Sequence, residues 1–326
     1  MSNHCFDDVL HLMQETTPTP NHIPDNFNAV KKIVKELDLD YKSTHWCRNG
    51  CMLYYKQDEQ LTSCKFCGSD RFKGGSGRGK NNPVAKTHYT PLIPRLQRLY
   101  AYKKSVEHMV WHNYHATQPG VLSHPSDAEA CKHFDRTSAL FAAEPRNVRI
   151  GLCVDGFNAY SNAVRLYSVW PIVVCVHNLP PHLCMTRPYM FLSFVIPRPN
   201  NPKNEIDVFL QPVIDELKML WNEGVDMYDI HANQTFKMKA ASMWTINDFP
   251  AYGMLSGWST HGPLSCPICQ DQMRESYLEH GHKMSWFDCH RCFLPRNHVF
   301  RRNRNAFTWV RVVHSQPPQR LTPEME

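Results

Sequence analysis

The chain has 326 residues, with 36 lysines and arginines against 30 aspartates and glutamates, a formal net charge of +6, 24 prolines and 13 cysteines. This length allows a sizeable core in more than one module, and the prolines argue against an all-helical bundle. The apolar runs have strand length, and the acidic N-terminus does not resemble a signal peptide, so we expect a soluble intracellular protein without a membrane segment. In a reducing compartment, paired cysteines predict metal sites before disulfides.

Four cysteines in the segment CRNGCMLYYKQDEQLTSCKFCGS form two close pairs, Cys47 with Cys51 and Cys64 with Cys67. A turn within each pair can bring two thiolates to one metal ion, and a short hairpin-like segment separates the pairs. This is the pattern of a tetrahedral zinc ribbon, and four protein ligands leave no open position for catalysis. Four unrelated buried cysteines are the alternative, but such residues rarely fall into two close pairs. We therefore predict a structural zinc ribbon over residues 41–73.

A basic, glycine-rich stretch follows the cysteines, and a helical pattern then runs from Pro91 to His115. Apolar residues recur along this segment at three- and four-residue spacing. Basic side chains lie around its other faces and are candidates for contact with DNA phosphates; they are Arg95, Arg98, Lys103 and Lys104. An ordinary surface helix is the simpler interpretation of the same pattern.

The apolar segment VRIGLCV predicts a buried strand over residues 148–154 that ends at Asp155 and Gly156. Further elements follow in the order strand, strand, amphipathic helix, strand and helix. The first four of these elements cover residues 165–176, 189–196, 206–221 and 235–246. The fourth strand ends at Asn247 and Asp248. This order is that of the first half of an RNase H-like fold, in which the first and fourth strands are adjacent and parallel.

In that fold the carboxylates of Asp155 and Asp248 would lie side by side. Mg²⁺ or Mn²⁺ would occupy the space between them, because hard divalent ions prefer oxygen ligands. Such ions activate a water or a 3′-hydroxyl for cleavage or transfer of a phosphodiester. The alternative interpretation makes Asp155 part of an Asp-Gly turn and Asp248 the cap of the next helix. A capping role and a metal-binding role for Asp248 can hold together.

A second zinc module is predicted over residues 261–313. Cys266 and Cys269 form another CxxC pair, and the last two ligands are either Cys289 with Cys292 or His290 with His298, with His261, His280 and His282 as outside candidates. The basic stretch RNHVFRRNRN in the same segment suits phosphate contact. Its candidate residues are Arg301, Arg302 and Arg304.

The predicted fold class is α/β, a partial RNase H-like (DDE) core preceded by a Cys₄ zinc ribbon and carrying a second zinc-knuckle module. The predicted organisation is a linker with one helix, the zinc ribbon, a basic linker with helices, the first half of the core, the zinc-knuckle insertion and a disordered tail. These segments cover residues 1–40, 41–73, 74–146, 147–260, 261–313 and 314–326.

Long motifs throughout residues 40–313 resemble the transposase of plant CACTA (En/Spm-type) DNA transposons. They are GCMLYYK, PLIPRLQRLYA, HPSDAEACKHFDR, FAAEPRNVRIGLCVDGFN, NEIDVFLQPVIDELKMLWNEGV and WTINDFPAYGMLSGWSTHGPLSCPICQ. The resemblance implies a nuclear DDE/D transposase that cuts and inserts DNA with Mg²⁺ or Mn²⁺. Its partners would be DNA at the transposon terminal repeats and other transposon-encoded proteins or a second copy of the chain. Asp155 corresponds to the first acid and Asp248 to the second.

The chain departs from this family's pattern at two places. The family's third acid lies on a helix further downstream than Glu326, so we expect a C-terminally truncated transposase that is inactive alone. The family shows CHRRFLP where this chain has CHRCFLP, which favours His290 and His298 over Cys292 as zinc ligands. The alternative function is a non-catalytic, zinc-containing DNA-binding remnant or a domesticated transposase, and a purely structural zinc protein that binds other proteins is a third candidate.

Overall fold

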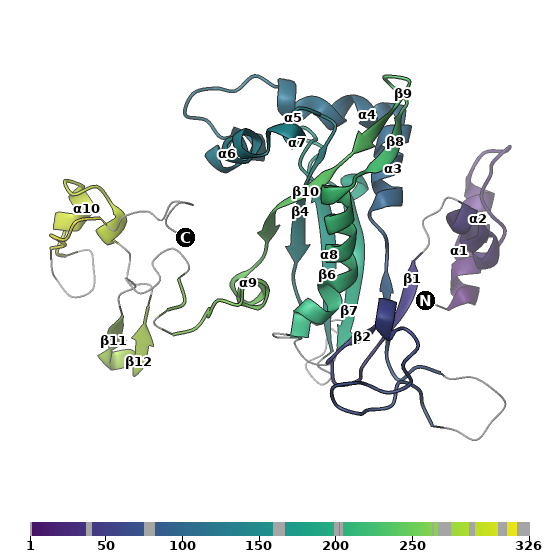
Figure 1. The fold of residues 1–326 in the computed structure, drawn as a ribbon, viewed down its shortest axis with the longest axis horizontal. Helices are drawn as coiled ribbons and strands as arrows, with labels where there is room; N and C mark the ends of the chain where they lie inside the picture. Colours follow the sequence, from purple (N-terminus) through teal and green to yellow (C-terminus); the bar gives the residue numbers. More distant parts are fainter. Residues whose placement is uncertain are drawn as a thin grey trace. The chain divides into compact units, whose positions relative to one another are not determined.

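The computed structural model describes residues 2–36, 41–74, 82–158, 167–198, 202, 205–262, 264–266, 275–286, 291–305 and 312–317. The chain forms two compact units, Met1–Asn247 and Asp248–Glu326 (Figure 1). In the described ranges, no helix has both the length and the apolar sequence that a bilayer-spanning segment needs.

The first unit is built on one mixed sheet of eight strands. Its strands are β1 (Lys42–Trp46), β2 (Leu53–Tyr54), β3 (Lys86–Tyr89), β4 (Val148–Val154), β5 (Phe157–Asn158), β6 (Ser168–Val176), β7 (Met190–Arg198) and β10 (Ala240–Ile246). They lie in the order β10-β4-β6-β7-β3-β1-β2, and β5 pairs with β6 beside this path. Strands β10 and β4 are parallel, and the other pairs are antiparallel. The cysteine-rich segment, the basic segment and the predicted core therefore all contribute strands to a single sheet.

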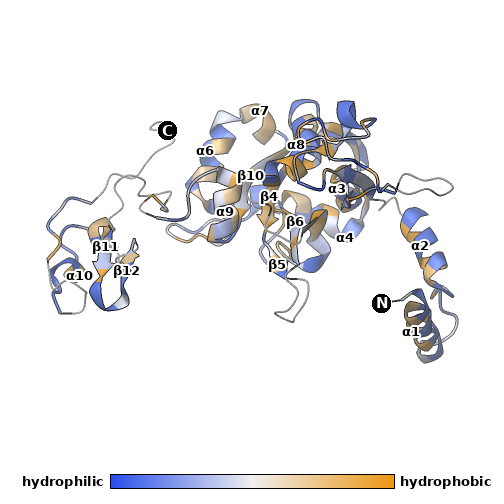
Figure 2. Cartoon of the chain, turned by 90° about the horizontal axis from the view of Figure 1, so that it is seen from below, coloured by the Kyte–Doolittle hydropathy of each residue, from blue (hydrophilic) through white to orange (hydrophobic). Residues whose placement is uncertain are grey.

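Strand β4 lies in the interior of this sheet, and its predicted bounds are confirmed. Six of its seven residues are buried, as expected for a strand covered on both faces. It pairs in parallel with β10 and antiparallel with β6. Figure 2 colours the ribbon by hydropathy and shows hydrophobic residues along β4 and β6. The apolar run in the sequence thus reflects the position of β4 between two hydrogen-bonded neighbours.

The single strand predicted over residues 235–246 is wrong, because the chain forms two strands there. Strand β9 (Gln234–Met238) pairs with β8 (Val225–Asp229) in a separate two-stranded sheet, and β10 joins the main sheet. The change occurs at Lys239, whose N–H donates to Asn147 Oδ1 at 2.7 Å and whose C=O accepts from Val148 N at 2.8 Å. These bonds, made to residues distant in sequence, fix the point where the chain enters the sheet.

Helix α8 (Ile206–Asn222) matches its predicted position and supplies a large part of the core. Its Phe209 is fully buried and packs edge-on against Trp46 of β1 at a ring distance of 5.3 Å. Glu216 of the same helix accepts hydrogen bonds from Leu92 N at 2.8 Å and Ile93 N at 3.0 Å. These bonds satisfy N–H groups at the start of α3 (Ile93–Ala101), which have no partner within that helix.

The continuous helix predicted from Pro91 to His115 is wrong, since the chain forms four short helices there. They are α3 (Ile93–Ala101), α4 (Lys103–Val106), the 3₁₀ helix η2 (Glu107–Val110) and α5 (Trp111–Tyr114). The first break is at Tyr102, whose backbone is extended with φ −107° and ψ 117°. Buried Ser105 stabilises it, because its hydroxyl donates to Leu99 O at 2.7 Å and covers a carbonyl at the end of α3.

Two helices lie at the N-terminus, where the sequence predicted one. Helix α1 (Asn3–Thr16) begins at a Ser2 cap and packs on α2 (Phe27–Glu36) through Phe6 and Phe27, whose rings lie 5.4 Å apart. The remaining helical elements of the first unit are η1 (Lys56–Asp58), η3 (Pro125–Asp127), α6 (Glu129–Thr137), α7 (Ala139–Ala142) and η4 (Arg187–Tyr189).

The second unit contains only short elements among its described residues. They are α9 (Phe249–Ser256), β11 (Ser276–Leu278), η7 (Glu279–Gly281), β12 (Lys283–Ser285), η8 (Arg291–Phe293) and α10 (Val299–Arg302). Strands β11 and β12 form an antiparallel pair. Helix α9 ends at Gly257, whose left-handed φ of 69° suits a helix terminus that favours glycine.

A substitution at Gly151 tests how closely β4 packs against the residues at the end of β6. A Cβ atom there would lie 2.4 Å from His177 Nε2 and 2.8 Å from Cys175 Sγ, and both of these residues are buried. We expect Gly151→Ala to lower the free energy of unfolding by about 1–3 kcal/mol in urea denaturation. Gly74→Ala is the matched control, since nothing lies within 4 Å of its added carbon. Equal stability of the two variants would contradict the packing described for β4.

Candidate metal centres and nucleic-acid interface

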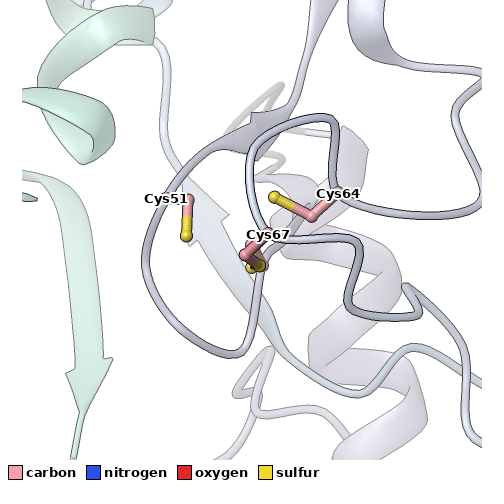
Figure 3. A group of neighbouring side chains, drawn as sticks. Cys51, Cys64 and Cys67 are labelled. Carbon is pink, nitrogen blue, oxygen red and sulfur yellow. The ribbon is translucent and has the colours of Figure 1, made fainter.

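The four cysteines of the predicted zinc ribbon come together in one cluster. The sulfur atoms of Cys47, Cys51, Cys64 and Cys67 all lie within 4.8 Å of one another, and those of Cys47 and Cys67 are 3.4 Å apart. Figure 3 shows Cys64 and Cys67 on one loop, facing Cys51 on another. Four sulfurs around one zinc ion would lie ~3.8 Å apart, given the usual zinc–sulfur distance. The cluster can therefore hold a metal ion such as zinc.

Two tight turns build this cluster from the sequence. In the first, Gly50 N donates to Cys47 O at 2.7 Å, and in the second, Gly68 N donates to Cys64 O at 2.9 Å. Both glycines have positive φ, 84° and 71°, a conformation that costs glycine little. Each turn places the second cysteine of its pair beside the first, which is the geometry that the CxxxC and CxxC spacings predicted.

The electrostatics of the cluster also fit a bound cation. Burial, together with smaller contributions from its hydrogen bonds to Cys67 and Cys47, raises the pKa of the Cys51 thiol to about 12. Hydrogen bonds to Ser69, joined by one from Asn49, lower the pKa of Cys67 to about 5. Four thiolates this close repel one another unless a cation lies among them, so a divalent metal would favour the fully deprotonated set.

The cluster is attached directly to the main sheet. Cys47 follows the last residue of β1, Trp46, which packs on Phe209 of α8. Met52 and Tyr54 are buried with the cysteines. The ion pair between Lys56 Nζ and Asp215 Oδ2, at 2.7 Å, also joins this segment to α8. A metal at the four sulfurs would therefore fix the end of the sheet formed by β1 and β2.

Asp155 directly follows β4 and its side chain is exposed. Asp155 Oδ1 accepts a hydrogen bond from Gly156 N at 2.7 Å. A Cβ atom at Gly156 would lie 2.3 Å from the Trp170 ring of β6, so the close approach of Trp170 requires glycine there. The Asp-Gly turn interpretation is wrong, because β5 continues along β6 in the register of β4, with Val154 facing Ile172 and Phe157 facing Val169. The carboxylate of Asp155 is exposed directly after a buried strand.

Asp248 caps the helix that follows β10. Its Oδ1 accepts from Ala251 N at 2.9 Å, which confirms the capping interpretation. Strand β10 pairs with β4 in parallel, with Ile246 opposite Cys153, so both strands end at the same edge of the sheet. Asp155 belongs to the first unit and Asp248 to the second. Metal binding by the two carboxylates stays a prediction.

A buried histidine–aspartate pair that the sequence analysis did not assign lies before β4. Asp127 Oδ1 is 2.7 Å from His115 Nε2, and its Oδ2 accepts from Ser123 N at 2.8 Å and His124 N at 2.9 Å. The bond to His115 is the main cause that holds the pKa of Asp127 well below its ordinary value. The HPSD sequence is the signal for this arrangement, because its aspartate closes the turn that its histidine begins.

The second predicted zinc module lies largely outside the described residues. Cys269, Cys289 and His290 fall there, while Cys266 is half-buried and described. His298 is described as well, and its Nδ1 accepts from Phe300 N at 3.2 Å, which makes it the cap of α10. Among the described side chains, a group of three or more close metal-ligating atoms occurs at the four-cysteine cluster alone. Zinc binding by this module therefore stays a prediction.

The DNA contact predicted for Arg301 is corrected, because this side chain is completely buried. Its guanidinium donates to the backbone carbonyls of Cys292, of Leu294 at 2.8 Å, of Val313 at 3.3 Å and of Ser315 at 2.6 Å. Five N–H donors in a rigid fork suit arginine to such a role. Arg301 therefore ties together the backbone of the second unit.

The other predicted DNA-binding residues are accessible. Arg302 and Arg304 are exposed on the second unit, and Arg302 lines a pocket of about 580 Å³ with Arg296 and His314. In the first unit, Lys103 and Lys104 are exposed. Arg95 and Arg98 are half-buried in α3 and line a common groove. Phosphate contact by these residues stays a prediction.

Comparison with known proteins identifies one family. Residues 119–325 match a family model described as transposase family tnp2. The match covers β4 and its two neighbours β6 and β10, together with β7, α8 and nearly all of the second unit. No curated protein matches the chain.

Removal of one sulfur ligand tests the cysteine cluster. We expect Cys64→Ser to abolish stable binding of the zinc ion and to lower the thermal unfolding temperature. The stability lost should be a few kcal/mol or more, since structural zinc contributes about 10–16 kcal/mol to zinc-finger peptides. Zinc content after dialysis and thermal unfolding are the measurements. The control is Cys5→Ser, a cysteine that is exposed in α1. Unchanged zinc content in Cys64→Ser would show that the cluster is not a zinc site.

Substitution of Arg301 tests its structural role. We expect Arg301→Met to destabilise the second unit by about 1–3 kcal/mol, because buried carbonyls lose their donors. Hydrogen exchange of residues 291–317 measures this effect within the unit. Arg302→Met, at the exposed neighbouring position, should leave exchange nearly unchanged. Faster exchange in both variants to the same degree would argue against the assignment.

Proposed function

The chain belongs to the tnp2 family of transposases, and we propose that it binds, cuts and joins DNA at the ends of a transposable element. The long motifs shared with plant CACTA (En/Spm-type) elements support that more specific assignment, and DNA as the substrate implies action in the nucleus. The net charge of +6 is favourable for a polyanionic partner.

The parallel pairing of β4 with β10 is the observation that carries this proposal. Cys153 of β4 and Ile246 of β10 face each other. Asp155 lies two residues beyond Cys153, and Asp248 lies two residues beyond Ile246. In parallel strands, positions of equal offset advance toward the same edge of the sheet. The strand order β10-β4-β6-β7, with α8 between β7 and β10 in the chain, further supports an RNase H-like core. Asp155 and Asp248 are then its first and second acids.

The donor set suits Mg²⁺ or Mn²⁺. Asp155 is exposed at a strand end, and Asp248 uses Oδ1 for the helix cap, which is compatible with metal contact through Oδ2. Bound divalent metal would supply the Lewis acidity for phosphodiester cleavage and transfer. The contribution of this chain is that Asp155 directly follows a buried strand of the main sheet and that the backbone of α9 orients Asp248 through its cap hydrogen bond.

Asp155 and Asp248 are the two acids that the proposed site takes from this sequence, and the leading proposal requires that both bind divalent metal. A zinc-containing DNA-binding protein without catalysis is the alternative, and it differs from the leading proposal in one measurable property. It requires no divalent metal at Asp155 and Asp248.

Titration of the protein with Mn²⁺ distinguishes the metal-binding proposal from the non-catalytic alternative. We expect Asp155→Asn and Asp248→Asn each to weaken Mn²⁺ binding at least tenfold, measured by electron paramagnetic resonance of free Mn²⁺ on zinc-loaded protein. Asp226→Asn is the matched control, because this aspartate lies on β8, outside the main sheet, and is paired with Lys237 at 3.0 Å.

Nicking of labelled terminal-repeat DNA in Mn²⁺ accompanies this titration. The metal-binding proposal fails if both Asp→Asn variants bind Mn²⁺ as tightly as the Asp226→Asn control. Turnover that is lost in Asp155→Asn would instead show that the polypeptide alone is active, contrary to the expectation above.

A further inference from the structure

A groove of about 660 Å³ lies between helix α3 and the start of β7 in the first unit. The break at Tyr102 forms one wall, and η4 with the first residues of β7 forms the other. Its lining includes the two arginines Arg95 and Arg98, the aromatic residues Tyr102 and Phe191, and Leu99 and Leu192. The metal sites discussed above do not use this groove.

The charge of the groove is positive. Arg95 and Arg98 lie on consecutive turns of the same face of α3, and none of the lining residues is acidic. Burial lowers the pKa of Arg95, and the nearby charge of Arg98 lowers it further. Glu216 lies close enough to oppose these effects, but its carboxylate is already bonded to Tyr89, Leu92 and Ile93. An anion in the groove would relieve the repulsion between the two arginines.

The remaining surface of the groove is apolar and aromatic. Leu99 and Phe191 are buried and form its floor. Tyr102 is 54% exposed and Leu192 is 46% exposed, and both are large side chains at its rim. Tyr102 is exposed because the extended backbone between α3 and α4 turns it away from the helical core. A simple phosphate would use the arginines and leave this surface in contact with water.

We propose that the groove binds a nucleotide of single-stranded DNA, with the phosphate at Arg95 and Arg98 and the base against Tyr102. This inference rests on the proposed action on DNA. A duplex presents phosphates to such a surface but keeps its bases stacked inside, so it would gain little from the aromatic wall. An unpaired base exposes its π-face and can stack on a tyrosine, as in sequence-tolerant single-strand binding.

The position of the groove relates it to the proposed carboxylate site through the sheet. Met190 of β7 faces Cys175 of β6, which in turn faces Gly151 of β4. Gly151 lies four residues before Asp155, or ~13 Å along the strand direction. The groove is thus set back from the edge where β4 ends. The groove would hold an unpaired segment of DNA at a distance from Asp155, separate from the phosphodiester that reacts.

Fluorescence anisotropy of the zinc-loaded full chain tests this proposal. The probe is a labelled oligothymidylate of about 12 nucleotides, within the range of single-strand site sizes, and its blunt duplex is the comparison. We expect Tyr102→Ala to weaken single-strand binding about 5- to 100-fold, the range of base–aromatic stacking, and to change duplex affinity less than about twofold. Tyr102→Phe keeps the ring and should bind as the natural chain does. Arg98→Gln should weaken both ligands and reduce the salt slope by about one.

Tyr114→Ala is the matched control, since this tyrosine is 70% exposed at the end of α5 and does not line the groove. Unchanged single-strand affinity in Tyr102→Ala would overturn the proposal, and so would an equal loss for single strand and duplex. The groove variants retain Asp155 and Asp248, so their Mn²⁺ binding should be normal. Failure of the groove and failure of the carboxylate site are therefore distinguished by different measurements.

Discussion

The hydrogen bonding of β4 on both sides is the constraint on which the first unit depends. A strand held between a parallel and an antiparallel neighbour cannot shift its register without breaking both pairings. The start of β4 is also fixed by buried Asn178, whose Oδ1 accepts from Arg149 N at 2.8 Å and whose Nδ2 donates to Asn147 O and Met109 O, each at 2.9 Å. With its start fixed and both sides paired, β4 presents Asp155 at a defined point of the sheet edge.

The cysteine cluster and Asp155 belong to the same unit of the structure. Strand β1 leads into Cys47, and the sheet continues from β1 through β3, β7 and β6 to β4. Helix α8 contacts the cluster's segment through Lys56 and the start of α3 through its Glu216. A metal at the four sulfurs would therefore stabilise the distant end of the sheet whose interior strand β4 leads into Asp155.

The sequence predicted the features that depend on local patterns. Strand β4, helix α8 and the four-cysteine cluster follow from apolar periodicity and ligand spacing. Features set by distant contacts were missed. The change of sheet at Lys239 depends on its hydrogen bond with Asn147. The burial of Arg301 depends on carbonyls from four separate positions. The sequence pattern shows only that the stretch is rich in arginine, which is why it resembled a DNA-binding patch.

Strand β2 has a consequence for the solution behaviour of the protein. In the described part of the chain it is the outermost strand beyond β1, and it contains only Leu53 and Tyr54. Exposed strand edges recruit other chains, and short terminal strands reduce that hazard. The turn of the first cysteine pair directly precedes β2, and the turn of the second pair follows η1. Metal depletion would therefore uncover the backbone of β1 as a template for intermolecular β-pairing, which makes zinc supply during expression a determinant of solubility as well as of folding.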